Sequence, residues 1–304
     1  MSARQVAALL LLAAVWGASF LFIRVAVPML GPFPLMAGRV LIAAVALWWF
    51  ARLRRMPIAL APYWRRLLVL GLVHAAAPFS LIALAEIHLS ASMAAVLVAA
   101  TPLFAALIGG VWLEERVTTK RVAGLLLGLG GVGVLMGWSP VVLNASVALS
   151  VAATLTASAC YAVGGIYARR RLSDAPVLTL AFGQQLAAAV WLAAPAVWAL
   201  PRAAASTAAI GALLALALVS TALAYLVFFW LNAQVGPVKT STVTYIIPVF
   251  GVLWGTLFLG ESATAGVLTG LGCILTSLLL VNSVPSRATR VGSAIAATLP
   301  QARS

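Results

Sequence analysis

Few side chains inside the apolar parts of this sequence could take part in chemistry. The chain holds five acidic residues and two histidines, and only His74 is expected well inside an apolar segment. Its imidazole could hydrogen-bond a substrate carboxylate, titrate near neutral pH, or bond to a neighbouring helix. The acidic residues are expected at or near segment ends: Glu86, Glu114, Glu115, Asp174 and Glu261. No carboxylate is therefore expected deep inside an apolar segment, where it could exchange a proton or bind a cation.

The patterns that membrane enzymes and metal sites require are missing from the sequence. Metalloproteases need an H-E-x-x-H helix and Mg²⁺-dependent transferases need clustered aspartates, but this chain has one aspartate and two histidines fourteen residues apart. A G-x-S-x-G motif and a P-loop are also missing. Cys160 and Cys273 lack metal-ligand spacing, so free thiols are expected. The sequence predicts no catalytic residue, no metal and no cofactor.

Aromatic and hydroxyl side chains within apolar segments are the candidates for binding a solute. Trp16 and Phe20 are one helical turn apart and share a face. An apolar cavity lined with aromatic rings and a few hydroxyls would suit an amino acid with a large side chain. Ordinary packing is the alternative for each candidate. The predicted substrate-binding residues are Trp16, Phe20, His74, Thr101, Tyr161, Gln185, Tyr225, Thr244, Tyr245 and Trp254.

A second set of residues is predicted to act in gating. Pro78, Pro102 and Pro248 interrupt helices and free backbone carbonyls, which produces either hinges or static bends. Arg24 and Arg39 are expected near the outer surface. There they could stabilise an outer gate, meet a departing carboxylate, or extend to lipid phosphate.

The elements that must position these residues are long apolar segments. The chain is 64% hydrophobic and 8% charged, with a mean hydropathy of +1.13, as is typical of membrane proteins. A segment in lipid must satisfy its own backbone hydrogen bonds, so long apolar runs predict helices and not a barrel. Ten spans are predicted, at roughly 5–27, 34–51, 67–85, 90–113, 120–137, 147–168, 176–199, 207–231, 237–259 and 263–281.

The second half of the sequence repeats the first. Without a gap, several residues reappear 146 positions later. Among them, Pro102, Phe104, Gly109, Leu113 and Glu115 return as Pro248, Phe250, Gly255, Leu259 and Glu261. Ten spans in two copies give an odd number per copy, so the second copy should cross the membrane in the opposite direction. The predicted fold is an all-α integral membrane protein of ten transmembrane helices in two inverted five-helix repeats, which permits alternating access. The repeats occupy residues 1–137 and 147–282, and a basic, disordered cytoplasmic tail follows at 283–304.

Membrane topology accounts for the net charge of +14. With the N-terminus inside, sixteen of the nineteen Lys and Arg residues fall in cytoplasmic segments, which is the positive-inside pattern. Both termini are therefore expected on the cytoplasmic side of a bacterial inner membrane. The expected partners are the lipid bilayer and a small-molecule substrate, and not nucleic acid. A monomer is expected, with a dimer as the alternative.

Several short motifs of the chain occur together in one transporter family. They are Trp16-Gly17-Ala18-Ser19-Phe20 followed by Arg24, then Arg39, Thr101-Pro102 with Glu115, and Ile247-Pro248 with Gly260-Glu261. In these motifs and in its doubled layout, the chain resembles the EamA-type branch of the drug/metabolite transporter superfamily over about residues 5–282. Its size and aromatic content are most similar to those of the bacterial aromatic amino-acid exporters.

The resemblance implies a transporter, and not an enzyme, that exports small organic solutes. Ion-coupled carriers often need a carboxylate at mid-membrane, and none is expected in this chain, so a facilitator is favoured. Amino acids, aromatic and others, with broad specificity are the expected substrates. Export of drugs or other metabolites, and flipping of a lipid-linked substrate by the same fold, are the alternatives. A structural assembly role is a third alternative, which the inverted repeat disfavours.

Overall fold

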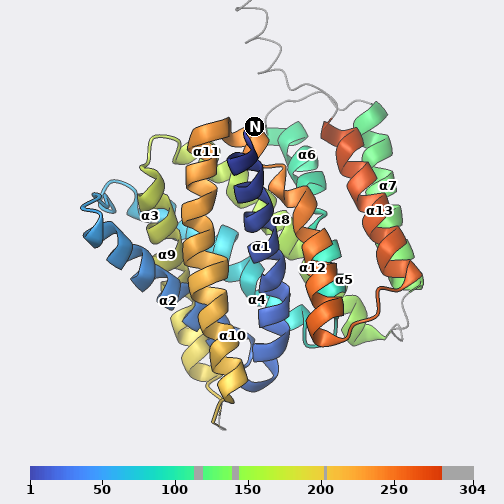
Figure 1. Cartoon of the computed structure of the whole chain (residues 1–304), viewed down its shortest axis with the longest axis horizontal. Helices are drawn as coiled ribbons and strands as arrows, with labels where there is room; N and C mark the ends of the chain where they lie inside the picture. The colour runs from blue at the N-terminus through green and yellow to red at the C-terminus, as the bar shows by residue number, and fades with distance from the viewer. Residues whose placement is uncertain (113–118, 139–143, 202–203, 283–304) are drawn as a thin grey trace, which may run out of the picture.

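The structure is a computed structural model that describes residues 1–112, 119–138, 144–201 and 204–282 (Figure 1). This part of the chain is helical and contains no strand. Its helical segments are α1 (Ala3–Leu30), α2 (Pro32–Leu53), α3 (Trp64–Gly71), η1 (Leu72–Ala76), α4 (Ala77–Ala85), α5 (Ala91–Val98), α6 (Thr101–Trp112), α7 (Thr119–Gly137), α8 (Ala145–Arg171), α9 (Val177–Trp198), α10 (Thr207–Ala217), η2 (Leu218–Leu223), α11 (Ala224–Thr240), α12 (Val243–Leu259) and α13 (Ala265–Asn282).

Each of the predicted spans coincides with one helix or with consecutive helical pieces. Seven helical stretches are long and apolar enough to cross a membrane. Three further helices, α7, α12 and α13, contain shorter apolar stretches at Val122–Leu135, Val243–Leu259 and Ala265–Ser277. The chain is therefore an all-helical membrane protein, and the count of ten crossings stays a prediction. The predicted tail at 283–304, and Glu114 and Glu115, lie outside the described residues.

Side-chain caps and chain-breaking residues set the ends of several helices. Ser90, Asn144 and Ser206 each accept a hydrogen bond from the backbone N–H three residues later, which satisfies one of the free donors at the start of α5, α8 and α10. Helix α1 ends at Leu30, and the Gly31 that follows has a φ of 74°, in a region that glycine tolerates. Pro32 then begins α2, a position where its missing N–H costs nothing.

Two π-helical turns interrupt long helices at matching places in the two halves. The turn η1 joins α3 to α4, and η2 joins α10 to α11. Leu72 and Leu218, their first residues, are 146 positions apart, which is the spacing of the sequence repeat. A π turn contains one more residue than an α-helical turn and often occurs at a functional site.

The helices pack in pairs that combine the two halves of the chain. Helix α1 contacts α12 and α10, α2 contacts α9, α4 and α6 contact α8, and α7 lies beside α13 at one edge of the molecule (Figure 1). The α1–α12 contact is close because Gly17 faces α12. A Cβ atom at Gly17 would lie 2.7 Å from the Cβ atom of Phe250. Small residues at such crossings let helix backbones approach in lipid.

Candidate functional site

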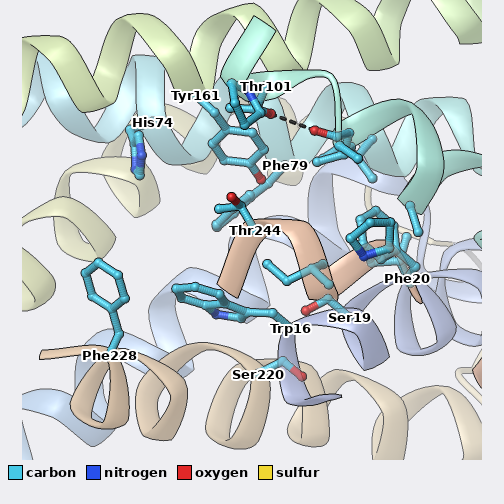
Figure 2. A pocket seen from close by; sticks show the side chains of 18 of the residues that line it. Trp16, Ser19, Phe20, His74, Phe79, Thr101, Tyr161, Ser220, Phe228 and Thr244 are labelled. Carbon is cyan, nitrogen blue, oxygen red and sulfur yellow. Dashed lines mark hydrogen bonds between the residues drawn. The ribbon is translucent and has the colours of Figure 1, made fainter. Parts of the chain in front are cut away.

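A cavity of about 310 Å³ lies among the helices that the two halves contribute. Side chains from α1, α2, η1, α4, α5 and α6 line it from the first half, and side chains from α8, η2, α11 and α12 from the second. Figure 2 shows side chains from both halves converging on this space. Its size and mainly apolar lining match those of a site for one small organic molecule.

Most of the predicted binding residues meet in this cavity, although they come from distant parts of the sequence. Seven of them line it: Trp16, Phe20, His74, Thr101, Tyr161, Tyr225 and Thr244. Three of the predicted gating residues line it as well: Arg39, Pro102 and Pro248. Five predicted residues lie elsewhere: Gln185, Tyr245, Trp254, Pro78 and Arg24.

Aromatic rings form two contacting groups on the cavity wall. Trp16 lies with its ring centroid 5.5 Å from Phe228 and 6.4 Å, edge to face, from Tyr225. The His74 ring meets Tyr161 edge to face, with centroids 5.5 Å apart. These rings offer both faces and edges to a bound molecule (Figure 2).

Each π turn contributes one polar side chain to the cavity. His74 lies in η1, and Ser220 lies 146 positions later in η2. The hydroxyl of Ser220 donates to the backbone carbonyl of Val15 at 2.9 Å. The Nδ1 atom of His74 is buried and has no hydrogen-bond partner among the described residues. This nitrogen is therefore a buried polar atom that no described group satisfies.

Two threonine hydroxyls of the cavity donate to backbone carbonyls three residues earlier in the chain. Thr101 donates to the carbonyl of Val98 at 2.7 Å, which is the carbonyl that Pro102 cannot serve because it lacks an N–H. Thr244 donates to the carbonyl of Ser241 at 2.8 Å. Both hydroxyls have used their proton, so toward a ligand they can act only as acceptors.

The predicted binding residues outside the cavity have other contacts. The indole N–H of Trp254 donates to the backbone carbonyl of Ala14 at 2.9 Å, which ties α12 to α1. Tyr245 packs against an apolar cluster that contains Leu97 and Leu271. Gln185 is fully buried, whereas its neighbour Gln184 donates to the Tyr225 hydroxyl at 2.8 Å.

The predicted gating residues that do not line the cavity are Pro78 and Arg24. Pro78 is buried in the first turn of α4, directly after η1. Arg24 donates through Nη1 to the backbone carbonyl of Glu86, beyond the C-terminal end of α4.

Several cavity residues were not among the predicted ones. Ser19 lies within the Trp16–Phe20 motif, and Phe79 and Ser220 lie 146 positions from the predicted residues Tyr225 and His74. The repeat could therefore have located both Phe79 and Ser220. Phe228 does not correspond to any of the predicted residues in the repeat.

The carboxylate of Glu261 joins the two halves at the start of α5. It accepts hydrogen bonds from the backbone N–H groups of Ala91 at 2.7 Å and Ser92 at 2.9 Å, and from the Ser92 hydroxyl at 2.6 Å. We call these contacts the Glu261 clasp. Ser90 serves the next N–H of the same helix, so the first three backbone donors of α5 all have partners. A carboxylate also interacts favourably with the positive end of a helix dipole.

Two comparisons relate the chain to known proteins by sequence. The profile of the EamA-like transporter family matches it twice, over residues 4–137 and 148–283. The uncharacterized transporter YvbV of Bacillus subtilis is 26% identical over 272 residues, which are 88% of each chain. A probable terminal-alkyne amino-acid exporter of Streptantibioticus cattleyicolor is 26% identical over 295 residues, or 92% of this chain and 93% of the relative.

One solved crystal structure has the same overall fold. It superposes with a TM-score of 0.65 at 19% identity, and the match covers 96% of this chain and 99% of the other. At this identity the likeness concerns the fold alone.

Proposed function

The chain belongs to the EamA-like transporter family, a family of small-solute transporters, and on that premise we propose that it exports amino acids from a bacterial cytoplasm. The observation that carries the proposal is the cavity, in which aromatic rings from both halves surround a few polar side chains. Trp16, Tyr161 and Phe228 suit an apolar or aromatic side chain, and His74 Nδ1 suits its polar head group. The relative from Streptantibioticus cattleyicolor, named as a probable amino-acid exporter, supports this substrate class.

The proposed mechanism is alternating access by two inverted five-helix repeats, residues 1–137 and 147–282. The two family matches support the duplication. The π turns support it as well, because their first residues have the spacing of the sequence repeat, 146 positions. The contacts of α1 and α8 correspond under this shift: α1 packs on α12 and α11, and α8 packs on α6 and α4. If the two repeats exchanged their conformations, the cavity would open first to one side of the membrane and then to the other.

The proposed location is a bacterial inner membrane, with both termini cytoplasmic. The distribution of Lys and Arg among the loops supports this orientation. A monomer suffices for the proposed function, because one chain supplies the whole described lining of the cavity.

Transport by the purified protein in sealed liposomes tests this function. Labelled phenylalanine and threonine should enter, glucose should not, and a pH gradient should not be required. Uptake only under a pH gradient would retain amino-acid transport but contradict the facilitator mechanism. Glucose, drug or lipid transport without amino-acid transport would contradict the proposed substrate class.

Replacement of Trp16 by alanine should lower phenylalanine uptake at least about fivefold, because the ring contributes packing to the cavity wall worth about 1 kcal/mol or more. Trp198→Ala is the matched control, since this side chain is 95% exposed on the described surface. The two variants should have similar thermal stability in detergent and differ in uptake. Equal uptake by both would remove Trp16 from the site.

A further inference from the structure

One cationic side chain faces the cavity from within the described structure. Arg39 lies in the second turn of α2, lines the cavity and is 6% exposed. Its Nε donates to the hydroxyl of Thr221 at 2.9 Å. Its guanidinium carbon lies 3.7 Å from the centroid of the Phe79 ring. Contacts from η2 and α4 therefore hold the guanidinium in one orientation.

No described carboxylate hydrogen-bonds to this guanidinium, although Glu86 attracts it electrostatically from outside the cavity. Across the described residues, no hydrogen bond is made by Nη1 or Nη2 of Arg39, so four of its five N–H donors have no protein acceptor. No described carboxylate lines the cavity. The carboxylate oxygens of Glu86 are buried but hydrogen-bond to no described group, Arg39 included. A guanidinium stays protonated in proteins, and burial without a partner is costly.

The repeat places no second cation opposite Arg39. The position 146 residues later is Gln185, which is neutral, fully buried and outside the cavity. The described cavity therefore has one positive group at one place on its wall. A ligand with one anionic group would be bound in a single orientation.

We propose that Arg39 binds the carboxylate of the substrate, and that this cavity requires a carboxylate but not an ammonium group. The two Nη atoms can donate in parallel to both oxygens of a carboxylate, which is the strong bidentate geometry. The apolar part of the ligand then lies along Phe79, Tyr161 and Trp16. No described carboxylate lines the cavity to pair with an ammonium, and Arg39 repels an amine that lacks an acid group.

This inference rests on the proposed function for the location of the transport site, but it changes the substrate class. Apolar and aromatic monocarboxylates should bind whether or not they carry an α-amino group. The corresponding amines should not bind. Amino acids are then one subset of the ligands that the cavity accepts.

Binding of three small molecules that share a phenyl ring tests the inference. They are 3-phenylpropionate, phenylalanine and 2-phenylethylamine, measured by calorimetry with the full-length protein in detergent, since weak acids cross lipid unaided. Both carboxylates should bind, and the amine should bind at least about 30-fold more weakly, as expected for loss of a buried charge pair. Equal binding of the amine, or no binding of either carboxylate, would overturn the inference.

Variants of Arg39 separate recognition from folding. Arg39→Gln should weaken binding of both carboxylates by at least about 30-fold and leave the amine no weaker than before. Arg39→Lys keeps the charge without the planar fork, so it should retain the preference for carboxylates at reduced affinity. The control is Arg54→Gln, which removes an exposed guanidinium outside the cavity and should preserve the order of the three ligands. Equal weakening of all three ligands in Arg39→Gln would mean that Arg39 has only a structural role.

The result also distinguishes this inference from the proposed function. Binding of 3-phenylpropionate without any transport of phenylalanine would refute amino-acid export and leave the role of Arg39 intact. Transport of phenylalanine, together with equal binding of phenylethylamine, would refute the role of Arg39 and leave amino-acid export intact. If Arg39→Gln does not fold, the preferences of the unmodified protein alone decide.

Discussion

Leucine at position 164 should remove most of the folded protein and its transport, whereas leucine at position 165 should leave both unchanged. The two glycines are neighbours on α8 but face opposite surroundings. A Cβ atom at Gly164 would lie 2.6 Å from the Cβ atom and 2.7 Å from Cδ2 of His74, whereas a Cβ atom at Gly165 would meet nothing within 4 Å. Gly164 is buried and Gly165 is exposed. The α8–η1 contact therefore has no room for a side chain at position 164.

The cost of leucine at Gly164 comes from overpacking. Extra carbon atoms in a well-packed interior cost about 1–3 kcal/mol or more, and here they would displace His74 from the cavity wall. Leucine at Gly165 adds the same apolar volume to an exposed helix surface, where lipid accommodates it. The measurements are the monodisperse yield in detergent, the thermal midpoint and phenylalanine uptake. A similar loss of yield, thermal midpoint and uptake in Gly164→Leu and Gly165→Leu would contradict the close contact of α8 with η1.

Alanine in place of Glu261 should lower the thermal midpoint by several degrees. The substitution removes three charge-assisted hydrogen bonds to the start of α5 and leaves the backbone N–H groups of Ala91 and Ser92 without an acceptor. Hydrogen bonds to charged groups contribute about 1.5–3 kcal/mol each. Because the clasp is partly accessible to solvent, water can replace some of these bonds, and we expect the free energy of unfolding to fall by about 3 kcal/mol in total.

Two further substitutions test this account of the Glu261 clasp. Glu261→Gln keeps one carbonyl oxygen as an acceptor, so its thermal midpoint should fall less than that of Glu261→Ala. Ser262→Ala alters the next residue, which is exposed and uses only its backbone in the described contacts, and should have no effect. An unchanged midpoint in Glu261→Ala would show that water replaces the clasp at no cost.

The positions of the helices could be predicted because lipid offers the backbone no hydrogen-bond partners. Each long apolar run must form its own backbone hydrogen bonds, so composition alone indicates a helix. The interruptions were harder to predict. Pro102 marks the break between α5 and α6, but η1 contains no proline and no glycine. A π turn depends on which side chains pack around it, and local sequence does not state this.

The candidate site could be predicted by residue type but not by helix face. In a soluble helix the polar face points outward, but here both the lipid and the protein interior are apolar, so periodicity does not separate them. Trp254 and Tyr245 were consequently predicted for the site, although they pack between helices. Arg39 was predicted near the outer surface. Because α2 already begins at Pro32, Arg39 lies two turns inside the helix and reaches the cavity.

The Glu261 clasp illustrates what the sequence repeat can and cannot indicate. The repeat marks Glu261 because it corresponds to Glu115, 146 positions earlier. It does not identify the partner, because Ser92 is 169 positions away in the chain. A contact between two halves depends on how they are arranged around each other. Local sequence similarity carries no such information.

The two π turns also bear on the history of the chain. Each turn contains one residue more than an α-helix of the same rise would need. Even so, the register between the copies is 146 both before the turns, at Arg24 and Arg170, and after them, at Pro102 and Pro248. An insertion in only one copy would have shifted that register by one. The extra residue is thus most simply older than the gene duplication. Its deletion from a single copy today would rotate every later side chain of that helix by about 100°.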